Sequence, residues 1–141
     1  MKKRICLDTG VIFQYFSKDC PSKVKILMHQ ISQQNVRAFV FKSVLIEVFN
    51  HLCKAYGKEK AKVQLISFIR KFHVIQLDLD ESLVFTAGLL KCQHGNNLSY
   101  IDCISIAYCL NNKVEFHTTE KLLKKVPGNT LKKLKVVKYE F

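Results

Sequence analysis

The stretch that decides the fold runs from residue 5 to residue 12 and reads Ile5-Cys6-Leu7-Asp8-Thr9-Gly10-Val11-Ile12. Its first three residues are all apolar, which is typical of a short strand buried on both faces. The polar segment 8–10 then predicts a turn, and the apolar residues after it predict a helix over about 11–17. An acidic side chain therefore directly follows a buried strand, at the edge where parallel sheets bind their ligands.

Helix and strand patterns alternate along the rest of the chain, with short connections. Strands are predicted over 3–7, 37–41, 72–77, 114–117 and 135–139. Helices are predicted over 11–17, 22–34, 44–56, 58–71, 80–94, 100–111 and 119–125. This alternation predicts an α/β fold, with a central, mainly parallel sheet of four to five strands covered by helices on both faces.

Local signals support these helix ends. Ser43 and Ser99 are suited to cap the helices that follow them, and Gly57 is suited to end the helix over 44–56. The length of 141 residues fits one compact domain, so we expect residues 1–141 to form a single domain.

The chain is strongly basic, with 23 Lys and Arg against 11 Asp and Glu and a formal net charge of +12 at pH 7. Such an excess favours a polyanionic partner such as RNA, because basic side chains that neutralise phosphates release condensed counterions. A basic, solvated surface without any polyanion is the alternative that the charge leaves open. No apolar run approaches the roughly 20 residues of a membrane-spanning helix. Because Asp8 interrupts the apolar run after the basic N-terminus, we expect no export signal and a cytoplasmic protein.

Four acidic residues from separate stretches are candidates for one site: Asp8, Glu47, Asp102 and Glu120. Taken singly, three have simpler explanations. Asp8 and Asp102 stand where helix-capping acids are found, and Glu120 would complement the dipole at the start of a helix. Glu47 is harder to explain, because it interrupts the apolar run 44–49 of a predicted helix. A carboxylate buried there is costly unless a cation, hydrogen-bond donors or solvent reach it.

Together the four acids indicate a metal site. Carboxylates brought close together raise one another's pKa unless a cation holds them ionised. Mg²⁺ prefers such oxygen ligands, and a bound divalent ion can activate water and neutralise charge on a phosphoryl oxygen. An acidic site within a basic protein therefore points to the hydrolysis of phosphodiesters.

Four segments, in order, resemble the PIN-domain nucleases, a family that includes the VapC-like toxins. Residues 5–12 are similar to the family's opening strand and its Asp-Thr-Ser turn. Residues 43–48 (SVLIEV) resemble the helix that carries the family's Glu, and residues 98–107 (LSYIDCISIA) resemble the segment with its third acid. Residues 114–123 (VEFHTTEKLL) resemble the closing strand and its Thr-x-Asp-x-x-Phe pattern. Each motif is weak alone, but four in the right order over essentially the whole chain are fairly specific.

The resemblance implies a three-layer α/β/α sandwich and a metal-dependent endoribonuclease. It implies Mg²⁺ or Mn²⁺ bound by Asp8, Asp102 and Glu120, with Glu47 completing the catalytic set at the edge of the metal site. Water would attack an RNA phosphodiester bond and leave a 5′-phosphate.

The resemblance also implies supporting residues and two departures from the family pattern. Thr9 and Thr118 would hold the metal-binding carboxylates by hydrogen bonds. Gly10 stands where the family usually has Ser, which removes one hydroxyl. Glu120 replaces the commoner Asp, so its carboxylate stands one methylene further out and is expected to need a bridging water to reach the metal.

Other side chains lie near the acids in sequence. The basic residues Lys121, Lys124 and Lys125 are expected to steer phosphate toward the site, and a solvated lysine face is the alternative. The aromatic residues Phe13, Tyr15 and Phe16 are expected to pack in the core rather than stack on bases. Metal-dependent hydrolysis needs no histidine base, so no role is predicted for His51 and His117.

For partners, the resemblance implies a homodimer and, if the chain is the toxin of a toxin–antitoxin pair, a small antitoxin that blocks the site. A non-catalytic RNA-binding or scaffold protein on the same fold is the main alternative. The presence of all four acids disfavours this alternative, and the longer Glu120 weakly favours it. A DNA-directed flap nuclease fits less well, because such enzymes carry more acids and a helical arch, for which 141 residues leave little room.

Overall fold

The fold is an α/β sandwich in which strands and helices alternate. The computed structural model describes residues 2–121, 123, 126 and 132–140. The strands are β1 (Lys3–Leu7), β2 (Val36–Phe41), β3 (Ile75–Leu77), β4 (Glu115–Thr118) and β5 (Val136–Lys138). The helices are α1 (Thr9–Phe16), α2 (Ser22–Ser32), α3 (Lys42–Tyr56), α4 (Lys58–Lys71), α5 (Glu81–His94) and α6 (Tyr100–Asn112).

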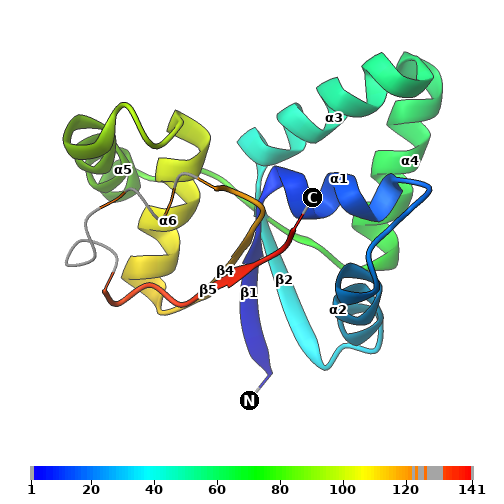
Figure 1. Cartoon of the computed structure of the whole chain (residues 1–141), viewed down its shortest axis with the longest axis horizontal. Helices are drawn as coiled ribbons and strands as arrows, with labels where there is room; N and C mark the ends of the chain where they lie inside the picture. Colours follow the sequence, from blue (N-terminus) through cyan, green and yellow to red (C-terminus); the bar gives the residue numbers. More distant parts are fainter. Residues whose placement is uncertain (1, 122, 124–125, 127–131, 141) are drawn as a thin grey trace.

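The five strands form one sheet in the order β3-β2-β1-β4-β5, and every neighbouring pair is parallel. Helices α1 to α4 lie on one side of this sheet, and α5 and α6 lie on the other (Figure 1). The predicted three-layer α/β/α fold is therefore confirmed. No helix within the described part of the chain has the length and apolar character needed to cross a membrane.

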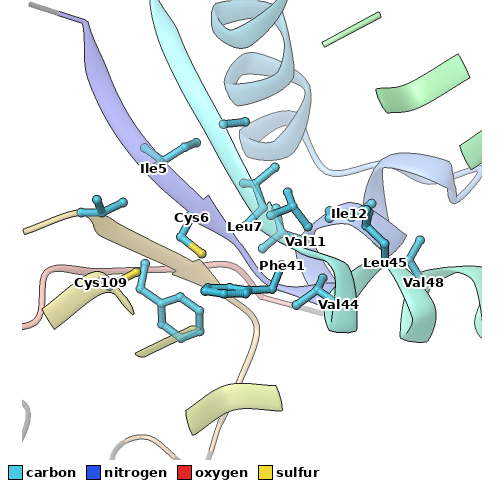
Figure 2. Packing of buried hydrophobic residues seen from close by; sticks show 14 of the residues in the cluster. Ile5, Cys6, Leu7, Val11, Ile12, Phe41, Val44, Leu45, Val48 and Cys109 are labelled. Carbon is cyan, nitrogen blue, oxygen red and sulfur yellow. The ribbon is translucent and has the colours of Figure 1, made fainter. Parts of the chain in front are cut away.

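Strand β1 lies at the centre of the hydrophobic core, because helices cover both faces of the sheet there. Its residues Ile5, Cys6 and Leu7 are fully buried. Figure 2 shows Cys6 near Cys109 of α6, and Leu7 among side chains of α1 and α3. Burial on both faces explains why this strand shows no apolar–polar alternation in the sequence.

The predictions for the helix starts at Ser43 and at residue 119 are wrong. Helix α3 begins at Lys42, directly after β2, and its N-cap is Phe41, which makes no side-chain capping bond. The strand runs into the helix without a loop, so Ser43 lies inside the first turn instead of capping it. The predicted helix over 119–125 also fails at its start, because residues 119–121 lie outside any helix.

The reason for the second error is a local hydrogen bond. The backbone amide of Glu120 donates to the side-chain oxygen of Thr118 at 2.9 Å. Such a bond between residues two positions apart offers the backbone an alternative to helix. Lys124 and Lys125, part of the same prediction, lie outside the described residues.

The amino edge of the sheet is built by three similar helix ends. Helices α2, α4 and α6 each lead into a strand through a residue with positive φ: Gln34 at 61°, His73 at 48° and Lys113 at 55°. Left-handed backbone is the usual way to end a helix, but glycine normally fills it. After α4 this turn occupies residues 72–74, so β3 begins at Ile75 and not at the predicted residue 72.

Candidate active site

A cleft of about 730 Å³ opens beside the carboxyl ends of β1 and β4. All four acids predicted from the sequence line it: Asp8, Glu47, Asp102 and Glu120. They come from the end of β1, from α3, from the first turn of α6 and from the segment after β4. The cleft thus lies where parallel sheets bind ligands, outside the carboxyl edge.

Asp8 is held rigidly at the centre of this edge. Its side chain is only 6% exposed. One carboxylate oxygen accepts a 2.9 Å hydrogen bond from the backbone amide of Thr9, and the other accepts a 2.8 Å bond from the hydroxyl of Thr118. Its own amide donates to the backbone oxygen of His117 at 3.0 Å. Asp8 is therefore both the N-cap of α1 and a member of the acidic cluster.

The pKa of Asp8 is raised from 3.8 to about 7, chiefly by burial and next by the neighbouring Asp102 carboxylate. The hydrogen bonds from Thr118 and Thr9 oppose this rise, and the charge of Glu47 adds to it. Asp8 is therefore a carboxylate that resists ionisation in the absence of a cation.

Asp102 is fixed by the capping box of α6. The hydroxyl of Ser99 accepts from the Asp102 amide at 3.1 Å, and the Asp102 carboxylate accepts from the Ser99 amide at 3.3 Å. The pKa of Asp102 is raised, chiefly by burial, and the charges of Glu120 and Glu47 contribute. The capping role considered as an alternative is thus present, and the same side chain also lines the cleft.

Glu47 and Glu120 complete the acidic wall. Glu47 lies on α3 and is half-buried, as is Glu120. Glu47 acts on the pKa of both Asp8 and Asp102, whereas Glu120 acts on that of Asp102. The four acids therefore form one electrostatic group, although they come from segments far apart in the sequence.

The two threonines predicted to support the site differ in how they do so. Thr118 is fully buried, and its hydroxyl donates to Asp8 while accepting from the amide of Glu120. Thr9 reaches Asp8 only through its backbone amide. The Thr9 hydroxyl is buried and has no hydrogen-bond partner among the described residues. A buried, unpaired hydroxyl at the cleft wall is what a bound water or ligand atom would satisfy.

The structure explains why residue 10 is glycine, which the sequence alone does not. A Cβ atom built at Gly10 would overlap the hydroxyl oxygen of Thr119. Thr119 also lines the cleft, so a hydroxyl stands where the family's serine side chain would begin. The sequence offered no signal for this contact, because the two residues lie at opposite ends of the chain.

Phe13, His51 and Lys91 are among the further residues that line the cleft and that the sequence did not assign to the site. The rings of Phe13 and His51 lie 5.2 Å apart, centre to centre. The Lys91 ammonium donates to the backbone oxygens of the α5–α6 loop at residues 95 and 98. Lys91 therefore brings a positive charge to the cleft, whereas Lys121 is exposed and does not line it.

Phe13, Tyr15 and Phe16 are all partly buried and pack against the core, as predicted. Tyr15 and Phe16 join a cluster of aromatic rings with Phe68 and Phe72 on α4 and its end. Of the three aromatic residues on α1, only Phe13 lines the cleft.

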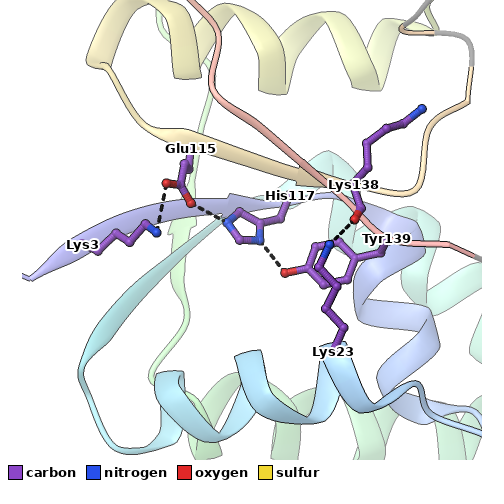
Figure 3. A network of polar contacts seen from close by, with 6 residues as sticks. All are labelled: Lys3, Lys23, Glu115, His117, Lys138 and Tyr139. Atoms are coloured by element: carbon purple, nitrogen blue, oxygen red, sulfur yellow. Dashed lines mark hydrogen bonds and ion pairs between the residues drawn. The ribbon is translucent and has the colours of Figure 1, made fainter.

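A polar network around the buried side chains of His117 and Tyr139 supports β4 (Figure 3). His117 contacts the Tyr139 hydroxyl at 2.7 Å and Glu115 at 2.9 Å, and Glu115 pairs with Lys3 at 3.0 Å. Burial lowers the pKa of His117 and raises that of Tyr139 to about 12. The network joins β1, β4 and the end of β5, and so fixes the strand that presents Thr118 to Asp8.

The donor set fits a hard divalent cation. It combines four carboxylates, of which Asp8 and Asp102 have raised pKa values, with the unpaired hydroxyl of Thr9, and such oxygens are the ligands that Mg²⁺ and Mn²⁺ take. Within the described residues, no three His, Cys, Asp or Glu side chains stand as a ready-made metal cluster. The fit therefore rests on the chemistry of the donors and on their mutual repulsion.

Solved structures share this fold. VapBC2 from Rickettsia felis, bound to a DNA fragment from its promoter, matches with a TM-score of 0.73 and 17% identity, over 97% of this chain and 99% of that one. DNA-bound VapBC from Salmonella typhimurium matches with a TM-score of 0.68 and 15% identity, over 98% of each chain. A toxin–antitoxin complex from Klebsiella pneumoniae matches with a TM-score of 0.65 and 17% identity, over 97% and 99%. No curated protein matches the sequence.

The structural matches show only a shared fold, whereas a family model shows the family. The model of the PIN domain matches residues 5–129, from the first buried strand to beyond β4. The matched range contains all four acids that line the cleft. The chain therefore belongs to the PIN domain family.

Proposed function

We propose that this PIN domain is a metal-dependent endoribonuclease that hydrolyses RNA phosphodiester bonds, and that it is the toxin of a toxin–antitoxin pair. The observation that carries the proposal is the gathering of four carboxylates, from four separate segments, in one cleft of a chain with a net charge of +12. PIN domains are nucleases, and the acidic cleft is where this one would act.

Asp8, Asp102 and Glu120 would hold Mg²⁺ or Mn²⁺, which when bound neutralises charge on the scissile phosphate and lowers the pKa of water. Asp8 is locked by two hydrogen bonds and Asp102 by its capping box, so neither needs to reorder. Each Asp8 oxygen keeps one further lone pair for a ligand. Glu47 faces these acids from α3 and is suited to orient the attacking water. Glu120, with its longer side chain, is suited to reach the ion through water.

The remaining cleft side chains suit an RNA strand. Lys91 offers a cation at the cleft, and the exposed ring of His51 lies beside Phe13. Aromatic surfaces of this kind stack on bases without regard to sequence. Phosphate would thus meet Lys91, and a neighbouring base would meet the Phe13–His51 pair.

The toxin assignment and the partners rest on the structural relatives. The matched Klebsiella pneumoniae structure is a toxin–antitoxin complex, and the chain covers nearly all of its matched chain. We infer a similar antitoxin for this chain, together with a homodimer. Exposed apolar side chains on α5, such as Phe85 and Leu89, offer a surface for such a protein contact.

The test is cleavage of a varied RNA pool by the purified protein with Mn²⁺. Asp102→Asn should abolish cleavage while circular dichroism shows an intact fold. Asp19→Asn is the matched control, because Asp19 is exposed and does not line the cleft. A DNA pool of the same sequences tests the choice of RNA.

The outcomes separate the candidate functions. Loss of cleavage in Asp102→Asn, with full activity in Asp19→Asn, supports the nuclease. If the protein binds the RNA pool with Mn²⁺ but cuts nothing, and the two variants behave like wild type, the scaffold alternative takes its place. Preference for the DNA pool would overturn the RNA assignment alone.

A further inference from the structure

A second hollow lies at the opposite edge of the sheet from the acidic cleft. This rear pocket has a volume of about 560 Å³ and is formed at the amino ends of β1 and β2 and by the turn before β3. In Figure 1 the amino ends of β1 and β2 form the lower end of the sheet, whereas α1 follows β1 at the upper end. The rear pocket shares no lining residue with the cleft.

The rim of the rear pocket is polar and mostly basic, with Gln34 as its neutral member. Lys2, Arg4, Arg37 and His73 line it, and none of its lining residues is Asp or Glu. The floor is apolar, and includes the buried side chains of Ile31, Ala38 and Phe72. Ligand sites are typically hollows of this size, apolar with a few well-placed polar groups.

With no anion bound, the positions of the two arginines are electrostatically unfavourable. Arg4 and Arg37 are direct partners in the parallel pairing of β1 with β2, so they stand on the same face of adjacent strands. Like charges directly opposite each other on a sheet are destabilising. The Arg4 guanidinium is directed to the backbone oxygen of Asn112 at 2.9 Å. Arg37 has no hydrogen-bond or ion-pair partner in the part of the chain that the structure describes.

Helix ends supply one explanation for this charge. Helices α2 and α4 finish near the rim, and cations are favourable beside free carbonyl groups at helix C-termini. Arg4 donates to a carbonyl at the end of α6 in this way, but Arg37 contacts no helix carbonyl among the described residues. Helix ends also do not explain why the basic rim encloses an apolar hollow.

We propose that the rear pocket binds a nucleotide, with its phosphate between Arg37 and His73 and its base on the apolar floor. Guanidinium groups bind phosphate through paired hydrogen bonds. The flat aromatic face of a base can pack on the apolar floor, which a simple anion would leave uncovered. The nucleotide is either free or one unit of an RNA chain, which share this chemistry. The site is separate from the acidic cleft and does not depend on cleavage there.

The test is a titration in EDTA, so that no RNA is cut. The probes are 5′-AMP, inorganic phosphate, a short single-stranded RNA and, for comparison, an aspartate-rich peptide. Backbone amide shifts in NMR spectra locate each ligand, and calorimetry gives its affinity. The variants are Arg37→Gln and His73→Gln. The charge-matched control is Lys62→Gln, since Lys62 is exposed on α4 and lines neither hollow.

5′-AMP is expected to shift the amides of Arg37 and His73 and to bind more tightly than inorganic phosphate. Each rim variant should weaken binding at least about tenfold, as for loss of a charged hydrogen bond, and Lys62→Gln by less than about twofold. If RNA but not 5′-AMP binds in this Arg37-dependent way, the nucleotide is recognised within a chain. Shifts confined to the acidic cleft, equal losses in all three variants, or tighter binding of an aspartate-rich peptide would each overturn the proposal.

Discussion

Replacing Asp8 by asparagine should stabilise the metal-free protein at neutral and alkaline pH, although Asp8 lies at the centre of the acidic cleft. Because the pKa of Asp8 is raised from 3.8 to about 7, the folded chain binds its proton more tightly than the unfolded chain does. The free energy of unfolding is therefore expected to fall as pH rises from about 4 to about 7. The asparagine side chain of the variant carries no charge, so the variant does not undergo this loss.

The size of the effect follows from two opposing contributions. A rise of about 3 pKa units corresponds to roughly 4 kcal/mol once Asp8 is fully ionised. The variant also loses the charged acceptor for the Thr118 hydroxyl, which costs about 1.5–3 kcal/mol. Asp8→Asn should thus be more stable than wild type by about 2 kcal/mol above pH 7 in EDTA, a rise in Tm of about 6 °C for a chain of this size.

Mn²⁺ should reverse this order. A ligand present at 100 times its Kd adds about 2.7 kcal/mol to the stability of the protein that binds it, and the variant should gain much less. Thermal unfolding by circular dichroism between pH 4 and pH 8, with EDTA or with Mn²⁺, measures both effects, and Asp19→Asn serves as the control. The reasoning is refuted if Asp8→Asn is less stable than wild type at pH 8 in EDTA, or if the difference between them does not change with pH.

Three further substitutions test the packing around the site. Gly10→Ala should lower the free energy of unfolding in urea by about 1–3 kcal/mol, because its Cβ overlaps the Thr119 hydroxyl. Adding Thr119→Ala should recover at least half of this loss, and an unchanged stability of Gly10→Ala would contradict the contact. Tyr139→Phe removes the hydroxyl that contacts His117 and should cost about 1 kcal/mol in the same assay; no loss would show that the contact does not contribute. Lys113→Gly relieves a left-handed residue and should add about 0.5–1 kcal/mol, seen as a higher Tm; a lower Tm would count against strain there.

The parts of the fold that follow from local signals could be predicted from the sequence. The run at residues 5–7 is buried on both faces, and the capping box of Ser99 and Asp102 is formed as its spacing suggests. Both features depend on residues within one turn of each other. The position of Asp8 at the carboxyl edge followed from the alternation of strands and helices, because parallel sheets place their ligands there.

The failures came from contacts that no local pattern encodes. Thr118 takes up the amide of Glu120, which turns a predicted helix start into a non-helical segment. Gly10 looked like a lost hydroxyl because nothing in the sequence connects it with Thr119. The position of Lys91 at the cleft could not be predicted, because it depends on how the α5–α6 loop folds around the Lys91 ammonium.

The hydrogen bond from Thr118 to Asp8 also has a consequence for synthesis. It joins residues 110 positions apart, and β4 must pair with β1 to bring them together. Chains grow from the N-terminus at about 5–20 residues per second, so roughly 5–20 seconds separate the synthesis of Asp8 from that of Thr118. A ribosome-bound or prematurely released fragment that ends before β4 lacks this brace and Glu120 alike. Only a chain synthesised past β4 and Glu120 can assemble the acidic cleft, so shorter fragments of the nuclease are expected to be inactive.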